Sequence, residues 1–351
     1  MLRLTIIFSL AYSVLSAQPS SVLFIGNSYT HMNDLYKIYT NLSVSKGKAV
    51  TADTLAVSGS SLKEHTLRPN TYKKIQSKNW DYVFIQGYSR ELSRDSARIA
   101  IETIPYAQQL IDSIKRHNPC VNIYFYMTWG YAEGFSDSIV GDTYALMQER
   151  IQKGYLQLSK ATGSYPIAPV GMVWQEIRNR YPELILYTED NAHPSIYGSY
   201  IAACTFYSCI YKSSPLNSHC PKKIEQIHAL NIQQTAADYV FQNLDYYNLD
   251  TIQVPKIQKS TKIDFTITEK WLSITLANKT IGGAKYYWDF GDGTNSARKN
   301  PKHYYAKDGK YTVTLYVLYD CNWHQLKKTV KVSKSQKDSK SPVKSKKPVK
   351  K

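Results

Sequence analysis

The sequence predicts an α/β fold, a parallel sheet with helices on both faces, followed by a smaller all-β sandwich. Between residues 20 and 170, short apolar runs alternate with helical patterns, the order of elements that a parallel sheet requires. From residue 260 to 333 the segments become short, β-rich and separated by turns, as in a β-sandwich. With 351 residues the chain is also too long for a typical single core and suits two domains.

Apolar runs provide the strands of the predicted sheet. A run such as DYVFIQ at 81–86 is apolar on both faces, which is typical of a parallel strand between two helical layers. Ligands of such sheets bind at the carboxyl ends of the strands. One rim is therefore expected to carry Ser28, Gly59, Gln86 and Trp129. The expected strands are 21–26, 49–57, 81–86, 121–128 and 165–170. One expected helix begins at 33–34, and three others cover 95–117, 142–161 and 222–247.

The first 17 residues predict export. Arg3 supplies a positive start, an apolar run follows, and the segment ends in the small residues Ser16 and Ala17, which a signal peptidase accepts. The run is too short to span a bilayer, and no later run is apolar enough to do so. We therefore expect a secreted or periplasmic protein that is not membrane-spanning.

The formal net charge of +17 raises the question of a nucleic-acid partner. The segment 334–351 alone carries eight Lys and one Asp, with only two valines as apolar residues, and predicts a disordered Lys-rich tail. Such a tail either increases solubility or contacts anionic cell-surface polymers. Export argues against a nucleic-acid partner.

Five cysteines are compatible with export, where disulfides form. A bridge from Cys220 to Cys209 or Cys204 is one expectation, and the odd count leaves at least one thiol free. No Cys or His spacing predicts a zinc site, so we expect neither a metal nor another cofactor.

The short stretch Gly26-Asn27-Ser28 stops an apolar strand abruptly, which is typical of a tight turn. A serine hydroxyl is a weak nucleophile and needs a base beside it. Asp190 and His193 lie three residues apart just before a predicted helix, so the carboxylate can hold one imidazole nitrogen while the other faces outward. This pattern predicts Ser28, His193 and Asp190 as catalytic residues.

These motifs resemble those of the SGNH (GDSL-like) hydrolase superfamily: an early G-N-S after the first strand, an isolated glycine after the second, here Gly59, and a late D-x-x-H. The G-x-S-x-G elbow of common α/β-hydrolases is absent. The resemblance covers about residues 20–247 and implies a three-layer α/β/α, flavodoxin-like fold. It also implies that Ser28 is the nucleophile and His193 the base, and that the backbone N–H groups of Ser28 and Gly59 form an oxyanion hole.

The third oxyanion donor of that superfamily is usually an asparagine in G-x-N-D after the third strand. This sequence instead reads Gly87-Tyr88-Ser89-Arg90. The carboxamide of Gln86, one residue earlier, is the donor we expect, and Ser89 is the alternative.

The loop at 129–141 mixes aromatic residues with glycines and is expected to lie over the catalytic rim. Trp129 and Tyr131 are predicted to stack on a sugar ring, although packing of this loop on the core is equally compatible with the pattern. His31 and Asn33 follow Ser28 closely and are further candidates for the pocket lining.

In the second domain, Trp288-Asp289-Phe290-Gly291-Asp292-Gly293 and the strand that follows resemble the PKD (polycystic-kidney-disease-like) domain, an immunoglobulin-like β-sandwich. This resemblance covers about residues 262–333 and implies a spacer or a contact module without catalysis. Trp288 is expected in its core.

The predicted organisation is a signal peptide at 1–17, a catalytic domain at 18–248, a linker at 249–261, a PKD-like sandwich at 262–333 and the tail at 334–351. The predicted function is an exported serine esterase acting on O-acyl groups, acetyl above all, of carbohydrate. The alternatives are a lipase or phospholipid esterase of the same superfamily and a non-catalytic carbohydrate-binding surface protein.

Overall fold

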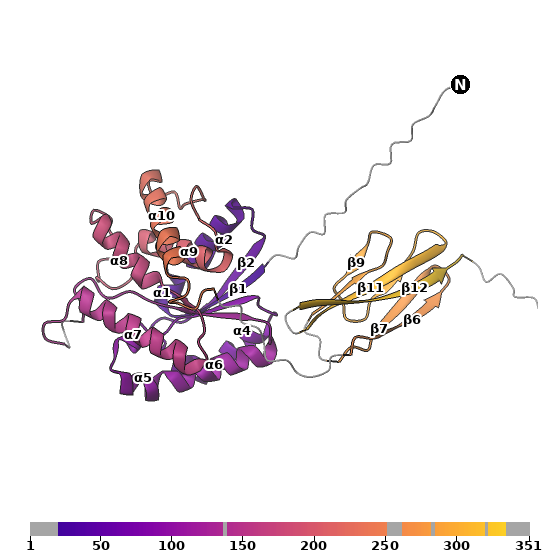
Figure 1. Cartoon of the computed structure of the whole chain (residues 1–351), viewed down its shortest axis with the longest axis horizontal. Helices are drawn as coiled ribbons and strands as arrows, with labels where there is room; N and C mark the ends of the chain where they lie inside the picture. Colours follow the sequence, from indigo (N-terminus) through magenta and orange to yellow (C-terminus); the bar gives the residue numbers. More distant parts are fainter. Residues whose placement is uncertain (1–19, 136–138, 251–261, 282–284, 320–321, 335–351) are drawn as a thin grey trace, which may run out of the picture. The chain divides into compact units, whose positions relative to one another are not determined.

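The computed structural model describes residues 20–135, 139–250, 262–281, 285–319 and 322–334. These residues form two compact units, one ending at residue 250 and the other starting at residue 262 (Figure 1). The predicted signal peptide lies outside the described residues, as do 251–261 of the predicted linker and 335–351 of the predicted tail.

A parallel sheet forms the centre of the first unit, as the sequence predicts. Its described strands lie in the order β2-β1-β3-β4-β5, the flavodoxin-like order in which the ligand site lies at the carboxyl ends of the strands. In the register, Ile25 of β1 pairs with both Leu55 of β2 and Ile85 of β3, so these three strands end side by side. The strands are β1 (Ser20–Gly26), β2 (Val50–Ala56), β3 (Tyr82–Ile85), β4 (Asn122–Tyr126) and β5 (Ile167–Ala168).

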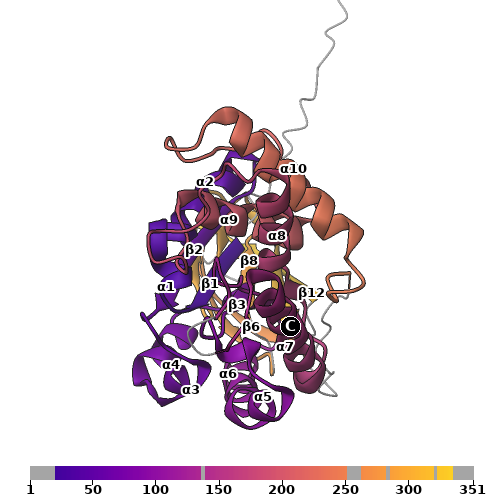
Figure 2. The ribbon, with the colours of Figure 1, turned by 90° about the vertical axis from the view of Figure 1, so that its left-hand side faces the viewer.

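Helices cover both faces of this sheet, since its inner strands β1, β3 and β4 are buried on both sides and must be shielded from water twice (Figure 2). One layer holds α2 (Leu35–Ser45), α8 (Val170–Arg180), α9 (Ile196–Tyr211) and α10 (Gln226–Gln242). The other layer holds α3 (Leu62–Leu67), α4 (Pro69–Gln76), α5 (Ser96–Glu102), α6 (Ile104–His117) and α7 (Tyr144–Thr162).

Helix α9, in the upper layer of Figure 2, is buried at every residue from Gly198 to Cys209. It is apolar almost all round, and Phe206 on it packs against Phe24 and Phe84 of the sheet with ring centroids 5.1 and 4.5 Å apart. A helix that is apolar on every side belongs inside a core. This burial fixes the start of α9, and therefore the loop that precedes it.

Two of the expected helices are interrupted or delayed by residues in non-helical conformations. The expected helix at 95–117 is divided at Thr103, where α5 ends and α6 begins with a proline in its first turn. The helix expected from 33–34 begins at Leu35 instead, because Asn33 and Asp34 have φ values of 56° and 52°, in the left-handed region. A short helix α1 (Ser28–His31) and a 3₁₀ turn η1 (Met32–Asp34) precede it.

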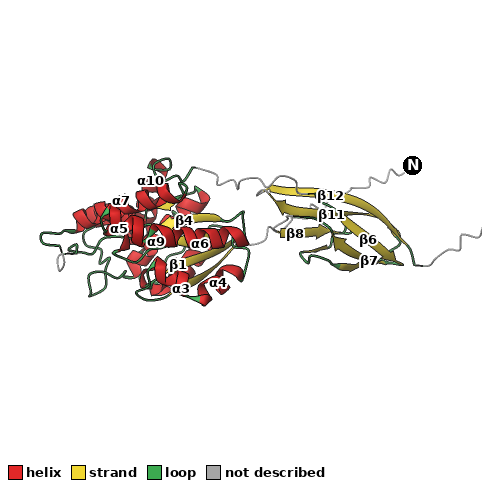
Figure 3. Ribbon diagram, turned by 90° about the horizontal axis from the view of Figure 1, so that it is seen from below, coloured by secondary structure: helices red, strands yellow, loops and turns green. Residues whose placement is uncertain are grey.

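The second unit contains only strands and loops among its described residues (Figure 3). Two sheets, ordered β10-β7-β6 and β12-β11-β8-β9, enclose a core in which Trp288 is fully buried and meets Phe265 edge to face. This is the predicted all-β sandwich. The strands are β6 (Phe265–Lys270), β7 (Ser273–Asn278), β8 (Lys285–Asp289), β9 (Asn295–Ser296), β10 (Lys302–Tyr304), β11 (Gly309–Tyr319) and β12 (Asn322–Val332).

The expected disulfide at Cys220 is wrong. Cys204, Cys209 and Cys220 are all thiols, and Cys204 and Cys209 are buried on α9 as small apolar side chains. Among the described helices, none has both the length and the apolar character that a membrane span requires.

Gly154 on α7 permits a close backbone approach that supports the rim. A Cβ at this position would lie 2.1 Å from the carbonyl oxygen of Leu92 in η2 (Glu91–Ser93). Helix propensity favours alanine over glycine, yet this contact leaves no space for a methyl group. We predict that Gly154→Ala destabilises the protein by about 1–3 kcal/mol in urea denaturation.

Lys160 is exposed on the same helix and serves as the control. Lys160→Ala should change the free energy of unfolding by less than about 0.5 kcal/mol. Equal stability of Gly154→Ala and the wild type would show that η2 can move away from α7 without cost.

Candidate active site

The turn between β1 and α1 presents Ser28. Asn27 caps α1, since its side-chain oxygen accepts a hydrogen bond from the N–H of Tyr29 at 3.1 Å. Gly26 must be glycine, because a Cβ there would lie 2.3 Å from both Gln86 Oε1 and Thr30 Oγ1. The Gly-Asn-Ser stretch therefore ends the strand, avoids this clash and starts the helix, which leaves Ser28 at the carboxyl end of the sheet.

Ser28 meets His193 across 165 positions of the chain. The Ser28 hydroxyl donates to His193 Nε2 at 2.8 Å, and His193 Nδ1 donates to the carboxylate of Asp190. Residue 193 lies in the loop before α9, whose first turn is capped by the side chain of Ser195. The structure thus brings together the serine, the imidazole and the carboxylate in the order that nucleophilic catalysis requires.

Asp190 is ionised and held in place by its own loop. Its Oδ1 accepts hydrogen bonds from the N–H groups of Ala192 and His193 at 3.0 and 2.9 Å and from the Thr188 hydroxyl at 2.8 Å. Burial alone would raise the pKa of this carboxyl, but the hydrogen bonds from His193, Ala192 and Thr188 outweigh it and hold the pKa well below its usual value. The carboxylate therefore stays charged and keeps the Nδ1–H tautomer of His193.

A stack of buried aromatic rings supports the serine and the imidazole from below. The rings of Trp174 and Trp129 lie 4.1 Å apart, and those of Trp129 and Tyr29 lie 4.5 Å apart, nearly parallel in both cases. The edge of Tyr29 then meets the ring of His193 at 5.3 Å. Because packed rings resist displacement, this stack fixes the distance between the turn of residue 28 and the loop of residue 193.

Trp129 is therefore a core residue, and the prediction that it stacks on a sugar is wrong. Its side chain is fully buried within the stack, and its Nε1–H donates to the carbonyl of Ala192 at 3.0 Å. Tyr131 is only partly buried; its hydroxyl lies 3.0 Å from that of Ser89, so it stays a candidate for the rim.

Gly59 lies in a turn that two side chains tie to the serine turn. Its φ of 71° is in the left-handed region, where glycine is favoured. The His31 ring bonds Ser58 Oγ at 2.9 Å, and Asn27 Nδ2 donates to Ser60 O at 3.5 Å. Within the described part of the chain, neither the Ser28 N–H nor the Gly59 N–H donates a hydrogen bond, so both stay available to a ligand.

Gln86 does not point into the site. It is fully buried, and its side-chain oxygen accepts from the N–H of Asn27 at 2.9 Å and from the hydroxyl of Thr30 at 2.7 Å, while its Nε2 donates to Gly87 O. These bonds hold the serine turn from beneath. The expectation of Gln86 as an oxyanion donor does not fit this geometry.

Asn33 is also occupied by the protein itself. Its Nδ2 lies 3.1 Å from the carbonyl oxygens of Pro194 and Ser195 and 2.9 Å from Ser199 Oγ. It therefore clamps the loop of His193 to the segment after Ser28. Since Asn33 is also exposed, its contact with substrate stays a prediction.

His65 on α3 was not anticipated from the sequence. Its Nε2–H donates to Gly26 O at 2.8 Å, its side chain is fully buried, and burial lowers its pKa. A neutral imidazole thus holds the end of β1 two residues before Ser28. The only signal for this role was the position of a lone histidine in a helix, which is too weak to predict it.

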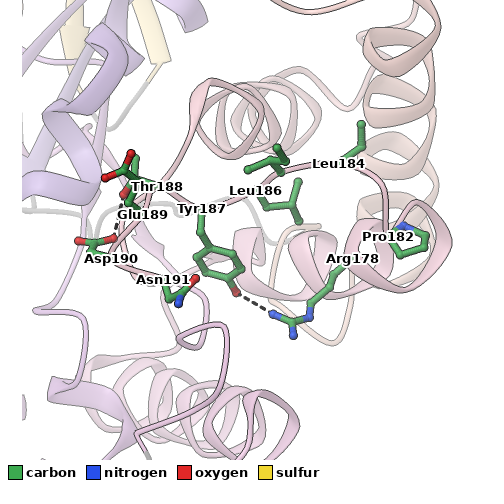
Figure 4. A pocket seen from close by; sticks show the side chains of 10 residues that line it. Arg178, Pro182, Leu184, Leu186, Tyr187, Thr188, Glu189, Asp190 and Asn191 are labelled. Atoms are coloured by element: carbon green, nitrogen blue, oxygen red, sulfur yellow. Dashed lines mark hydrogen bonds between the residues drawn. The ribbon is translucent and has the colours of Figure 1, made fainter.

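An open cleft of about 1020 Å³ borders Asp190 (Figure 4). Figure 4 shows the hydroxyl of Tyr187 facing the guanidinium of Arg178, at 3.5 Å, on its wall. Arg178 also donates to Ala132 O at 2.9 Å and thereby ties the 129–135 loop to α8. The cleft is lined by Arg178, Pro182, Leu184, Ile185, Leu186, Tyr187, Thr188, Glu189, Asp190 and Asn191.

In the part of the chain that the structure describes, no three His, Cys, Asp or Glu side chains come together as metal ligands. The fold and the site define a three-layer α/β/α domain with a Ser-His-Asp arrangement at the carboxyl end of its sheet, and a β-sandwich further along the chain.

Comparison with known proteins identifies the sandwich. Residues 257–333 match the family model of the PKD domain. The PKD1 domain of the Vibrio cholerae metalloprotease PrtV is 30% identical; the match covers 98% of that domain and 21% of this chain, with a TM-score of 0.20. The C-terminal part of this chain is a PKD domain.

The α/β unit has structural relatives of low sequence identity. A DUF4886 family protein from Bacteroides uniformis matches with a TM-score of 0.55 and 19% identity, over 64% of this chain and 95% of that one. The acetylxylan esterase Axe2 from Geobacillus stearothermophilus matches with a TM-score of 0.40 and 16% identity, over 54% of this chain and 93% of that one. The first of these supports the fold.

The position of Gln86 gives a prediction about stability. Gln86→Met fills a similar volume but leaves the Asn27 N–H and the Thr30 hydroxyl buried without an acceptor. We expect the free energy of unfolding to fall by about 2–5 kcal/mol in urea denaturation. Gln234→Met, at an exposed glutamine that bonds only Asp238, is the matched control and should have little effect. A Gln86→Met variant with wild-type stability and lost activity would contradict this structural role.

Proposed function

We propose that this chain is an exported serine esterase that removes O-acyl groups, acetyl above all, from carbohydrate. The observation that carries the proposal is the continuous hydrogen-bond chain from Ser28 Oγ through His193 to Asp190. The superfamily resemblance of the G-N-S and D-x-x-H motifs supports the same reaction class, and the N-terminal 17 residues support export.

In the proposed reaction Ser28 Oγ attacks the ester carbonyl carbon while His193 Nε2 takes the hydroxyl proton. The same imidazole then gives that proton to the leaving alcohol oxygen, which leaves an acyl-Ser28 ester. A water molecule, deprotonated by His193, attacks this ester and releases the acid. Asp190 stabilises the imidazolium in both steps and needs no proton transfer of its own. The mechanism needs no cofactor.

The oxyanion formed in each step needs donors that are free in the resting protein. The unpaired N–H groups of Ser28 and Gly59 are suited to this role, because they belong to neighbouring turns that His31 and Asn27 hold together. Removal of one such donor typically costs about 3–4 kcal/mol of transition-state stabilisation. Ser89 is the candidate for a third donor, since Gln86 is occupied elsewhere.

The choice of a carbohydrate ester rests on the predicted export and on the PKD domain carried by the same chain. The open cleft beside Asp190 does not decide it, because the polar Arg178 and Thr188 share its lining with the apolar Leu184, Ile185 and Leu186. Ser28 and His193 are not among its lining residues. A lipase of the same superfamily is therefore the alternative that the substrate test must separate.

Removal of the nucleophile tests the proposal. Ser28→Ala should lower kcat for p-nitrophenyl acetate by roughly 10⁴- to 10⁶-fold, with an unchanged melting temperature. Acetyl esters should be hydrolysed faster than octanoyl esters. A wild-type rate in the variant would rule out the proposed mechanism, and a preference for octanoyl esters would favour a lipase.

The role of the carboxylate gives a second, separate test. In Asp190→Asn an amide NH₂ faces Nδ1 and selects the tautomer in which Nε2 carries the proton, so the ring cannot accept from Ser28. We expect kcat to fall roughly 10⁴-fold. Asp245→Asn, the same substitution at an exposed carboxylate that does not line the cleft, should retain wild-type activity. An equal loss of activity in both variants would show that kcat depends on the net charge of the protein rather than on the tautomer of His193.

A further inference from the structure

The hairpin between β6 and β7 of the PKD domain carries an exposed tryptophan in an unfavourable conformation. Trp271 is 63% exposed, and its φ is 58°. It is the first of two loop residues between the paired Lys270 and Ser273. A positive φ at this first position is the pattern of a type II′ turn, in which glycine is strongly preferred.

Folding does not account for this tryptophan. The second loop residue, Leu272, is buried in the sandwich core, so its apolar side chain contributes to folding. The Trp271 side chain is exposed and makes no such contribution. A bulky residue in the left-handed region destabilises the turn relative to glycine. Strain of this kind concentrates where a side chain has a function.

A second exposed aromatic side chain lies on the strand next to this hairpin. Tyr304 of β10 is 68% exposed and pairs with Ser273 of β7, which pairs in turn with Lys270. The N–H of Tyr305 donates to Leu272 O at 2.8 Å, which fixes the end of β10 beside the hairpin loop. Two aromatic rings therefore stand at the same end of one three-stranded sheet.

The outward face of this sheet is polar and positively charged. Strand alternation puts Phe265, Ile274 and Leu276 inside, where they are buried. The outward positions hold no carboxylate and no Leu, Ile, Val or Met; they are Thr266, Thr268, Lys270, Ser273, Thr275, Ala277, Lys302 and Tyr304. Lys270 Nζ lies 5.3 Å from the centre of the Trp271 ring.

We propose that this face, with Trp271 and Tyr304 as its aromatic contacts, binds an acidic polysaccharide. Pyranose rings have an apolar C–H face that stacks on indole and phenol rings, and their hydroxyl edges bond the flanking Thr and Ser side chains. The ammonium groups of Lys270 and Lys302 attract the carboxylates of uronate units. A protein partner is less suited to this surface, since it lacks the aliphatic side chains of an interface core.

The full-length protein and two variants of unchanged charge test this site with polygalacturonate as the probe. Binding is measured by calorimetry at 0.5 M salt, where screening weakens attraction by scattered lysines, including those at 334–351. Trp271→Gly and Tyr304→Thr should each raise Kd at least about tenfold. Trp271→Gly should also leave the melting temperature unchanged or raise it, because glycine relieves the turn.

Tyr316→Thr on β11 is the matched control and should bind as the wild type does. Tyr316 belongs to the four-stranded sheet, away from the proposed face, and its ring lies 6.0 Å from that of its neighbour Tyr287 on β8. Wild-type protein that fails to bind at 0.5 M salt, or Trp271 and Tyr304 variants with wild-type affinity, would overturn the proposal. Equal affinity for neutral dextran would overturn the assignment to an acidic polymer. All of these results are independent of the proposed esterase activity, since no ester is involved.

Discussion

One hydrogen bond, from Ser28 Oγ to His193 Nε2, joins the two halves of the candidate site. Its partners belong to turns that are far apart in the sequence, so the bond depends on everything that fixes both turns. The stacked rings of Trp174, Trp129 and Tyr29 set the separation, and Asn33 clamps the two segments together. The site is therefore a product of core packing rather than of local loop structure.

The features that sequence could reveal are those dictated by local chemistry. Apolar runs predicted the inner strands of the sheet, since a strand buried on both faces has few polar positions, whereas the edge strand β2 also carries Thr51, Asp53 and Thr54. The G-N-S turn and the three-residue spacing of Asp190 and His193 predicted the groups that meet in space, because the two motifs together are more specific than either one alone.

The features that sequence could not reveal depend on which way a side chain points. Gln86 and Trp129 follow strands at the rim, and either could have faced the ligand. The Gln86 side chain points towards the Asn27 N–H because Gly26, which has no Cβ, leaves room for its amide. The Trp129 side chain points inward because its ring stacks on that of Trp174. Both choices are made by residues distant in sequence, which no local pattern encodes. The same holds for His65, whose acceptor is 39 positions away.

In the proposed mechanism Ser28 forms a covalent acyl-enzyme with help from His193 and Asp190. The most direct measurement is covalent trapping with diethyl p-nitrophenyl phosphate, followed by mass spectrometry of the intact protein and of its peptides. We expect one diethylphosphoryl group per chain, carried by the peptide that contains Ser28. Modification of a different residue would rule out Ser28 as the nucleophile. So would a protein that stays unmodified and releases no p-nitrophenol.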